Sequence, residues 1–482
     1  MSAGRATLAA VIDPSGPTPP AGTESFSPAE LARLSGGRLV HDGGRPIVGA
    51  AVDSRRIVPG NLFVALPGER TDGHEHLAEA VANGAAAVLI SRPGRPSETP
   101  DSVSVIRVGR PLEALGAIAA GWRNRFNPLT VGITGSIAKT STKEAVADVL
   151  AVRFRTLRSE GNENNEIGLP LTVLRLERAD DALVLEMGMY VGGEIADLAR
   201  IGRPRIGVVT AVQPVHLSRI GSIEAIERAK AELVEALPAA GTAVLNADDE
   251  RVARMARRTA ATVLTYGFSD DAEVTAEQVV SAASEGMRFV LRTRAGRRPV
   301  SLPGLGRHSV HNALAAAAVG TAAGLGLDEI ATGLAVRPPA AHRGELLRLG
   351  DVTILDDSYN AAPASMRAAL AVLADLPGRR VAVLGEMLEL GAGHDAGHVE
   401  VGTAAAAVAE LLVVVGRGAA PIARAARAAG MSPSRVIEVD DREAALDALR
   451  PRLAGGDVVL VKASRGIALD RLVDALQAEL GR

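Results

Sequence analysis

The segment from Pro128 to Leu150 constrains the fold of this chain more than any other. It runs from an apolar, β-branched stretch ending at Gly135, through a short polar turn, into a helix-compatible stretch. A strand, a turn and a helix in this order form the first half of a parallel α/β unit. Further buried-strand candidates follow at 182–185, 206–212, 243–245 and 263–266, with a helix over 222–237. The pattern predicts a mostly parallel sheet.

The length of the chain and the positions of its Gly- and Pro-containing turns predict three α/β domains. The 482 residues correspond to about three domains of ordinary size. Short strand and helix signals alternate from Ser27 to about Arg125, and a new set of strand candidates follows Pro338-Pro339. That set lies at 353–355, 381–384, 411–415 and 458–461. We expect a flexible tail at 1–24 and domains at 25–126, 127–337 and 338–482.

The core of these domains must be aliphatic. Aromatic residues make up 2% of the chain, whereas hydrophobic residues make up 47%. This composition suits Val, Ile and Leu strands packed between Ala-rich helices, and it argues against platforms that stack nucleic-acid bases. A net charge of −3 also lacks the basic excess that binds a phosphate backbone. We therefore expect an α/β protein with no nucleic-acid partner.

Cysteine usage and hydropathy narrow the remaining chemistry. The chain has no cysteine, so any metal must be held by oxygen and nitrogen ligands. The longest apolar stretch, 314–327, is interrupted by glycines and is shorter than the ~20 residues that a bilayer span needs. The apolar patch at 8–12 is too short for the core of a signal peptide. We expect a cytoplasmic protein with no membrane span.

A phosphate-binding loop is predicted at the turn Gly135-Ser136-Ile137-Ala138-Lys139-Thr140. In such a loop, amides at a helix N-terminus face the phosphates, the lysine neutralises them and a hydroxyl holds Mg²⁺. Ala138 stands where the usual loop has glycine, and its β-carbon restricts the backbone. The segment is also compatible with an ordinary strand-to-helix turn whose lysine is solvated.

Two side chains at strand ends could complete a Mg²⁺ site beside this loop. Glu186 follows the strand candidate 182–185, and His216 follows the candidate 206–212. Open α/β sheets bind ligands at the carboxyl ends of parallel strands, and Mg²⁺ takes most of its ligands from substrate and water. A strand-end Glu or His is equally compatible with a cap or a surface residue. Lys230 fits an ordinary solvated lysine on a helix.

Two polar segments are further site candidates. Residues 161–168 form an Asn-rich turn whose side-chain amides would suit a polar, carboxylate-bearing ligand, although an ordinary loop has the same composition. The segment Asp356-Asp357-Ser358-Tyr359-Asn360 places two acids and one of three tyrosines directly after the strand candidate 353–355. A rare tyrosine in a loop at a strand end indicates a site.

Together with further motifs, these segments resemble the Mur ligase family from about Val48 to Leu476. The motifs lie at 53–55, 59–66 and 72–74, then at 132–144, 161–170, 222–232, 245–249 and 311–314, and finally at 356–361, 365–366, 384–391 and 461–465. Each is weak alone. Their order and spacing over more than 400 residues make coincidence implausible.

The resemblance implies a fold and an activity. The fold is a small N-terminal α/β domain that binds a UDP-linked substrate, a central P-loop ATPase-like domain and a C-terminal Rossmann-like domain. The activity is ATP-dependent addition of D-alanyl-D-alanine to the C-terminal carboxylate of UDP-N-acetylmuramoyl-tripeptide through an acyl phosphate, for peptidoglycan synthesis. The family likeness also implies a monomer.

The resemblance assigns roles to individual residues. Thr134 to Thr140 would bind the ATP phosphates, with Asn312 on the adenine side and Arg343 and Asp357 as contacts from the third domain. Mg²⁺ would be held by Thr140, Glu186, His216 and Lys230, the last at a position that family members carry as a carbamylated lysine. The catalytic residues would be Lys139, Glu186, His216 and Lys230. Substrate contacts would come from Ser54, Arg55, Asn164, Asn165, Tyr359 and Asn360.

Some positions depart from the family pattern, namely Ala138, Ala362, Ala463 and Glu386. One alternative is another ligase of the family that adds a single amino acid to a muramyl or folyl substrate. The Asp-Asn-Pro-Arg motif of the diaminopimelate or lysine adders is absent, and the segment 356–360 favours the dipeptide adder. The other alternative is a non-catalytic nucleotide-binding protein in which Ala138 marks a degenerate loop.

Overall fold

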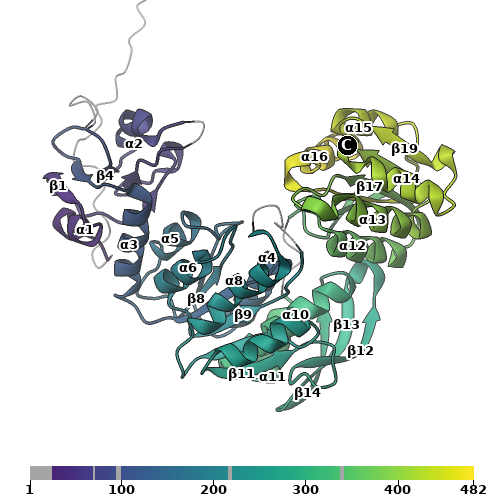
Figure 1. The fold of residues 1–482 in the computed structure, drawn as a ribbon, viewed down its shortest axis with the longest axis horizontal. Helices are drawn as coiled ribbons and strands as arrows, with labels where there is room; N and C mark the ends of the chain where they lie inside the picture. Colours follow the sequence, from purple (N-terminus) through teal and green to yellow (C-terminus); the bar gives the residue numbers. More distant parts are fainter. Residues whose placement is uncertain (1–23, 69–70, 94–98, 215–219, 337–340, 482) are drawn as a thin grey trace, which may run out of the picture. The chain divides into compact units, whose positions relative to one another are not determined.

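A computed structural model describes residues 24–68, 71–93, 99–214, 220–336 and 341–481. The chain divides into two compact units, which we describe separately. The first contains residues 1–128, 162–180 and 200–202, and the second contains residues 129–161, 181–199 and 203–482. Figure 1 shows the helices and strands of the mixed α/β fold.

The first unit is built on a five-stranded sheet of order β1-β5-β4-β3-β2. Strands β2 to β5 are parallel, and β1 is antiparallel to β5. The strands are β1 (Arg38–His41), β2 (Ala50–Ala51), β3 (Leu62–Val64), β4 (Ala87–Ile90) and β5 (Ser104–Arg107). The helices are α1 (Pro28–Leu34), α2 (Leu77–Ala82), α3 (Pro111–Arg123) and α5 (Gly168–Val173). Every residue of β4 is buried, as expected for a strand covered on both faces.

The chain's single tryptophan fixes the packing of helix α3 in this unit. The ring of Trp122 lies 4.5 Å from that of Phe26, and its indole N–H donates to the carbonyl of Leu176 at 3.0 Å. This bond ties the segment after α5 to α3, although more than fifty residues separate them.

The second unit begins with a six-stranded sheet of order β11-β10-β9-β6-β8-β7, in which all neighbouring strands are parallel. The strands are β6 (Leu129–Thr134), β7 (Thr156–Arg158), β8 (Ala182–Glu186), β9 (Ile206–Val209), β10 (Thr242–Asn246) and β11 (Thr262–Tyr266). The connecting helices are α4 (Lys139–Ala151), α6 (Glu194–Gly202), α8 (Ile223–Glu235) and α9 (Glu250–Ala253). The predicted mostly parallel sheet is therefore confirmed, and Ser222 caps the predicted helix by accepting from the amide of Ala225.

An antiparallel three-stranded sheet follows, and the periodicity of the sequence did not reveal it. It contains β12 (Thr275–Ser281), β13 (Met287–Thr293) and β14 (Gly296–Leu302), in that order. One face carries Met287, Phe289 and Leu291, which belong to the same hydrophobic core as the parallel sheet. Helices α10 (Gly306–Ala322) and α11 (Leu327–Leu334) complete this part of the unit.

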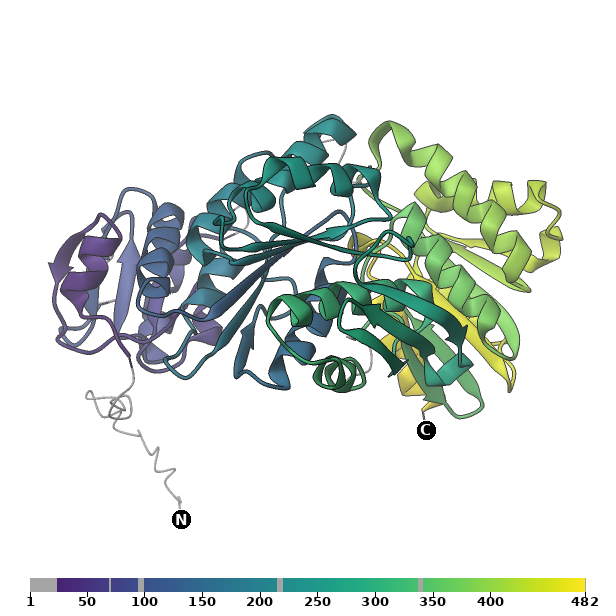
Figure 2. The same ribbon diagram turned by 90° about the horizontal axis from the view of Figure 1, so that it is seen from below.

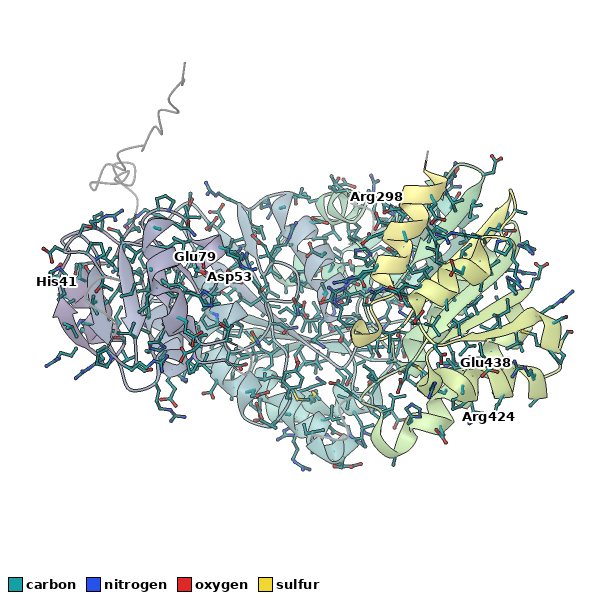
Figure 3. The ribbon with its side chains drawn as sticks, turned by 90° about the horizontal axis from the view of Figure 1, so that it is seen from above. His41, Asp53, Glu79, Arg298, Arg424 and Glu438 are labelled. Carbon is teal, nitrogen blue, oxygen red and sulfur yellow. The ribbon has the colours of Figure 1, made fainter. Side chains whose placement is uncertain are left out.

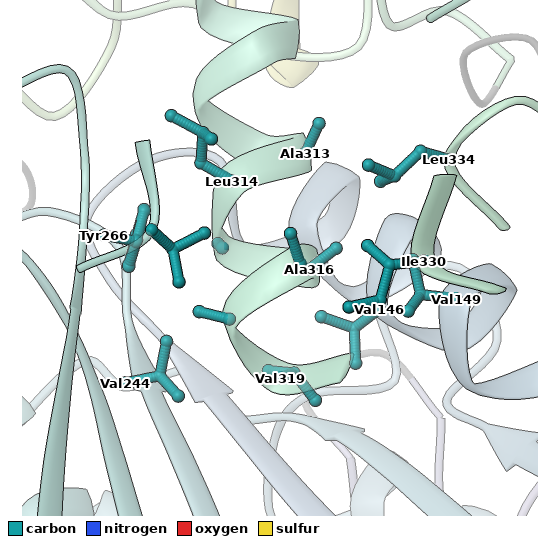
Figure 4. Close-up of a cluster of buried hydrophobic side chains, with 14 of the residues drawn as sticks. Val146, Val149, Val244, Tyr266, Ala313, Leu314, Ala316, Val319, Ile330 and Leu334 are labelled. Carbon is teal, nitrogen blue, oxygen red and sulfur yellow. The ribbon is translucent and has the colours of Figure 1, made fainter. Parts of the chain in front are cut away.

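The core here is almost wholly aliphatic, as the composition predicts. Figure 4 shows Leu314 and Val319 of α10 among valines of α4 and β10 and Ile330 of α11. The Ala-rich run of α10 lets helix and sheet approach closely because alanine adds little bulk. Within the described residues, no helix is both long and apolar enough to cross a membrane.

The last part of the second unit is a six-stranded sheet of order β15-β16-β20-β17-β18-β19. All neighbours are parallel except β15, which pairs antiparallel with β16. The strands are β15 (Glu345–Leu349), β16 (Val352–Asp356), β17 (Arg379–Gly385), β18 (Leu411–Val415), β19 (Val436–Val439) and β20 (Asp457–Lys462).

Helices cover this sheet on both faces. They are α12 (Pro363–Asp375), α13 (His394–Val408), α14 (Ala420–Ala428), α15 (Arg442–Leu449) and α16 (Asp470–Leu480). Figure 1 shows α15 and α16 on the side opposite α12 and α13, and Figure 2 gives the same elements from below. Because β20 returns between β16 and β17 after the chain has built β17, β18 and β19, the strand order reverses there. In open α/β sheets such a reversal is where ligands bind.

Candidate nucleotide and metal site

The phosphate loop lies between the end of β6 and the first turn of α4. Gly135 has φ +154°, and a β-carbon at this position would lie 1.8 Å from the hydroxyl oxygen of Thr210. That hydroxyl donates to the carbonyl of Ile137 at 2.6 Å, and the amide of Ser136 donates to the carbonyl of Ala211 at 2.8 Å. The loop is thus fixed on the segment that follows β9, and glycine is required at Gly135.

Ala138 has the left-handed backbone that such a loop normally assigns to glycine. Its φ is 66° and its ψ is 2°, and it directly precedes the first residue of α4. A non-glycine residue in this region costs about 1–2 kcal/mol. The backbone of the loop keeps the left-handed conformation at Ala138 in spite of this cost.

The side chain of Lys139 lies over the loop. Its ammonium donates to the carbonyl of Gly135 at 2.8 Å and to that of Ser136 at 3.4 Å. Burial lowers the pKa of Lys139, the carboxylate of Glu186 opposes this shift, and the charge of Arg343 adds to it. Lys139, Glu186 and Arg343 therefore share one electrostatic environment.

Thr140 and Glu186 meet at the carboxyl end of the sheet. The hydroxyl of Thr140 donates to Oε2 of Glu186 at 2.8 Å, and the two residues are 7% and 1% exposed. Nearby in the chain, the buried hydroxyl of Thr134 has no hydrogen-bond partner in the described part of the chain. A buried hydroxyl and a carboxylate are ligands of the kind that Mg²⁺ prefers.

The described residues contain no group of three or more His, Asp or Glu side chains placed to hold a metal ion by themselves. Mg²⁺ is commonly bound through one or two carboxylates together with substrate phosphates and water. The Thr140–Glu186 pair beside a phosphate loop fits that mode of binding. His216, the third predicted ligand, lies outside the described residues.

Lys230, on α8, is buried, contrary to the ordinary solvated lysine that its spacing allows. It is 3% exposed, and burial together with the charge of Lys139 lowers its pKa well below the ordinary value. Both effects favour the neutral amine. A neutral amine is a nucleophile, whereas an ammonium is not.

A cavity of about 260 Å³ lies beside the loop helix and brings Asn312 and Arg343 together. Asn312, on α10, also accepts from the hydroxyl of Thr142 on α4, at 3.5 Å. The other lining residues include Ser141, Glu144, Asp148, His308 and Ser309. Asn312, predicted on the adenine side of ATP, and Arg343, predicted as a third-domain contact to the nucleotide, therefore line one cavity.

Asp357 and Tyr359 follow the end of β16, and Asp357 contacts Lys462, the last residue of β20. The ammonium of Lys462 donates to Oδ2 of Asp357 at 2.5 Å and to the carbonyl of Asn360 at 2.9 Å. The ring of Tyr359 lies 4.0 Å from the guanidinium of Arg343 and 5.3 Å from that of Arg465. These contacts connect the segment 356–360 to the reversal of strand order between β16 and β20.

Ser54 and Arg55 lie in the first unit, on a short helical turn. The buried hydroxyl of Ser54 donates to Oε2 of Glu79 at 2.6 Å. Arg55 is exposed and pairs with Asp53 through two bonds of 2.7 and 2.9 Å, which lower the pKa of Asp53 to about 2. Asp53 and Glu79 are labelled in Figure 3.

Asn164 and Asn165 belong to the first unit, and the phosphate loop belongs to the second. The side-chain oxygen of Asn165 accepts from the amides of Ile167 and Gly168, at 3.3 and 2.9 Å, where α5 begins. The side-chain oxygen of Asn165 is therefore occupied with the turn that leads into α5.

Sequence reasoning missed Asp148, His308 and Ser309, which line the cavity. It included Glu144, Lys462 and Arg465 in the motifs 132–144 and 461–465 but gave them no role. The signal for some of them was helical spacing, because 141, 144 and 148 lie on one face of α4, as do 308 and 312 on α10. No local pattern connects Lys462 with Asp357, since more than a hundred residues separate them.

Models of one family match the chain in three consecutive segments. They are described as "Mur ligase family, catalytic domain" over residues 46–123, "Mur ligase middle domain" over 133–320 and "Mur ligase, glutamate ligase domain" over 342–465. The chain belongs to the Mur ligase family.

Among individual relatives, the UDP-N-acetylmuramoyl-tripeptide–D-alanyl-D-alanine ligase of Mycobacterium tuberculosis is 40% identical over 94% of this chain and 97% of the relative. The structure of MurF from Acinetobacter baumannii superposes with a TM-score of 0.84 and 28% identity, covering 95% of this chain and 99% of that one. The MurF ligase of Thermotoga maritima in complex with ADP has a TM-score of 0.78 and 27% identity, covering 90% of this chain and 98% of that one.

Proposed function

We propose that this chain is an ATP-dependent ligase that joins D-alanyl-D-alanine to the C-terminal carboxylate of UDP-N-acetylmuramoyl-tripeptide. The product is the UDP-linked pentapeptide used in peptidoglycan synthesis. The observation that carries the proposal is the phosphate loop with Lys139 over it and the Thr140–Glu186 pair beside it, in a chain 40% identical to a ligase of that name.

A carboxylate is a poor electrophile, so the reaction needs an activated form of it. ATP phosphorylates the tripeptide carboxylate, which gives an acyl phosphate and ADP. The free amine of the dipeptide attacks the acyl carbon, a tetrahedral intermediate forms, and phosphate leaves as the amide bond is completed.

The residues of the phosphate loop stabilise the charge on the transferred group. Lys139 already lies over the loop, so its ammonium needs only to exchange the carbonyls of Gly135 and Ser136 for phosphate oxygens. The N-terminus of α4 adds a favourable dipole. Such pre-positioned charges supply most of the catalysis in phosphoryl transfer.

Asn312 and Arg343 line the cavity that we assign to the adenosine part of ATP, and Asp357 is held close to Arg343. Because the side-chain amide of an asparagine can both donate and accept, Asn312 suits the edge of a base. The ion pair of Asp357 with Lys462 keeps its carboxylate in one place. The T. maritima ligase in complex with ADP supports the binding of an adenine nucleotide by this fold.

Thr140 and Glu186 would hold Mg²⁺, with His216 and Lys230 as further ligands. When bound, the ion would neutralise charge on the phosphates. Lys230 can join a cation site only if it loses its positive charge. Its lowered pKa favours the neutral amine, which is the form that reacts with CO₂ to give an anionic carbamate.

The remaining assignments concern the other substrates. We propose Ser54 and Arg55 at the UDP end, Asn164 and Asn165 near the peptide, and Tyr359 and Asn360 near the incoming dipeptide. In these assignments, the segment 25–126 binds the UDP end and the segment 127–337 binds ATP with Mg²⁺ and the peptide. The segment 338–482 binds the acceptor and completes the nucleotide site. Because ATP and UDP-linked precursors are cytoplasmic, we propose that the enzyme acts there, as a monomer.

Phosphate release measured with ATP, UDP-N-acetylmuramoyl-tripeptide and D-alanyl-D-alanine tests the proposal. We expect release only when all three are present, and a loss of release in Lys139→Ala. A matched control is Arg298→Ala, which removes a cation from β14, a strand without a predicted site residue, and should retain the wild-type rate. Release with single amino acids, or binding of ATP without turnover, would contradict the proposed reaction.

A further inference from the structure

The chain has four lysines, at positions 139, 143, 230 and 462, among 53 basic residues that are otherwise all arginine. Three of the four have a place in the proposed site: Lys139 lies over the phosphate loop, Lys230 is the buried amine, and Lys462 holds Asp357. Lys143 has no such role and is fully buried. Lys143 is therefore a buried lysine without a role in the proposed site, in a chain whose other basic residues are mostly arginine, and its presence needs a physical reason.

The ammonium of Lys143 has a partner for each of its three N–H groups. It donates to the carbonyl of Ser159 at 2.7 Å and to that of Gly161 at 3.1 Å, and it lies 2.9 Å from Oε1 of Glu144. A buried cation is tolerated when it is fully partnered in this way. Glu144 lies on α4 itself, and the carbonyls of Ser159 and Gly161 hold this helix against the segment that follows β7.

That segment in turn holds the end of β8. The amide of Ser159 donates to the carbonyl of Val184 at 3.0 Å, and the hydroxyl of Ser159 accepts from the amide of Glu186 at 3.3 Å. The carboxylate of Glu186 accepts from Thr140, which lies on α4 three residues before Lys143. Contacts therefore run in a closed ring from Thr140 along α4 to Lys143, through Ser159 to Glu186, and back to Thr140.

We infer that Lys143 is a positioning residue that fixes the Glu186 carboxylate relative to the Thr140 hydroxyl and so sets the affinity of the nucleotide site for Mg²⁺. This inference rests on the proposed metal site. Lys143 need not touch ATP or the ion to act, because it holds Ser159, and Ser159 holds the backbone of Glu186. Residues one step removed from a metal ligand commonly change metal affinity by about 10- to 100-fold when they are replaced.

The chemistry of the site explains why this position is lysine. Two carbonyls and one carboxylate surround a single nitrogen, and an ammonium directs three N–H groups away from one atom. The guanidinium of arginine spreads its donors over a larger plane and needs more space. Lys143→Arg therefore keeps the positive charge but cannot direct three N–H groups from one atom. This variant tests the positioning role more sharply than a variant that only removes the charge.

The test uses the full-length protein and calorimetric titration of ADP at a series of Mg²⁺ concentrations. In Lys143→Met and Lys143→Arg we expect the Mg²⁺ concentration that half-saturates the tightening of ADP binding to rise by about tenfold or more. The matched control is Leu150→Ala, which lies on the same helix in the hydrophobic core and outside the ring of contacts. It should lower the melting temperature and leave the Mg²⁺ dependence within about twofold of wild type.

Two further variants separate the possible failures. If Glu186→Gln leaves the Mg²⁺ dependence unchanged, the proposed metal site is wrong, and the inference falls with it. If Glu186→Gln shifts the dependence but both Lys143 variants match wild type, only the inference is overturned. If neither Lys143 variant folds, Ser159→Ala removes the next contact in the ring and should give the same shift, and a wild-type response there overturns the role of Lys143.

Discussion

The backbone conformation of Ala138 predicts that replacement of this residue by glycine stabilises the phosphate loop. Its φ of 66° and ψ of 2° lie in the left-handed region. Ala138→Gly removes a penalty of about 1–2 kcal/mol there. Glycine also makes the unfolded chain more flexible, which costs about 0.4–1 kcal/mol. The difference leaves a gain of about 0.7 kcal/mol, or roughly threefold in the equilibrium for opening the loop.

Gly135→Ala, in the same loop, should have the opposite effect. Its β-carbon would overlap the hydroxyl of Thr210, at 1.8 Å, and displace the bond of that hydroxyl to Ile137. Overpacking of this kind costs about 1–3 kcal/mol, and the lost hydrogen bond adds about 1 kcal/mol. The pair of variants therefore tests the same loop in both directions.

Hydrogen exchange resolved by peptide is the suitable assay, because it reports the opening of α4 and its loop separately from the rest of a multidomain chain. We expect about threefold more protection in Ala138→Gly and at least about tenfold less in Gly135→Ala. A threefold loss of protection in Ala138→Gly would refute the argument, since it would mean that the alanine is not strained. The KM for ATP in Ala138→Gly should be equal to or lower than that of the wild type.

Three further predictions concern charged side chains. The pKa of Lys230 lies below its unfolded value of 10.5, so the unfolded chain binds the additional proton and stability rises with pH. In CO₂-free buffer, the melting temperature of the wild type should therefore rise more between about pH 7 and about pH 9 than that of Lys230→Met. Parallel curves for the two proteins would contradict this prediction. Lys462→Met releases the carboxylate of Asp357 and should raise the KM for ATP by about tenfold with little change in kcat, so an unchanged KM would remove Asp357 from the nucleotide site. Arg55→Ala removes the guanidinium that lowers the pKa of Asp53 to about 2. In this variant, NMR titration should place the pKa of Asp53 near 3.8. A pKa that stays near 2 would show that other groups cause the shift.

The strands and the phosphate loop could be predicted because their signals are local. Val458 to Val461 and Leu411 to Val415 are continuous apolar runs, and such runs in a chain of this type form strands that helices cover on both faces. The loop could be placed for the same reason, because strand, turn and helix follow one another within about twenty residues. The sequence also identified Glu186 as a strand-end residue, and the structure shows that its carboxylate meets Thr140.

The antiparallel sheet β12–β14 could not be predicted in the same way. Its outer face carries charged residues such as Arg288, Arg292 and Arg297, so its strands lack continuous apolar runs. Strand β13 does alternate, with Met287, Phe289 and Leu291 on its buried face, but β12 and most of β14 show no comparable alternation. The position of this sheet in the fold depends on which surface covers it, and a local pattern does not contain that information.

By itself, the sequence determined the class of fold, the aliphatic core and the residue types that can bind phosphate and Mg²⁺, because these follow from composition and from short-range spacing. Only the tertiary structure decided which of the side chains meet. It buried Lys230 beside Lys139, brought Asn312 and Arg343 to one cavity, and linked Lys143 through Ser159 to Glu186. These contacts join residues that the chain separates, and the burial that changes their chemistry exists only after the sheets and helices have packed.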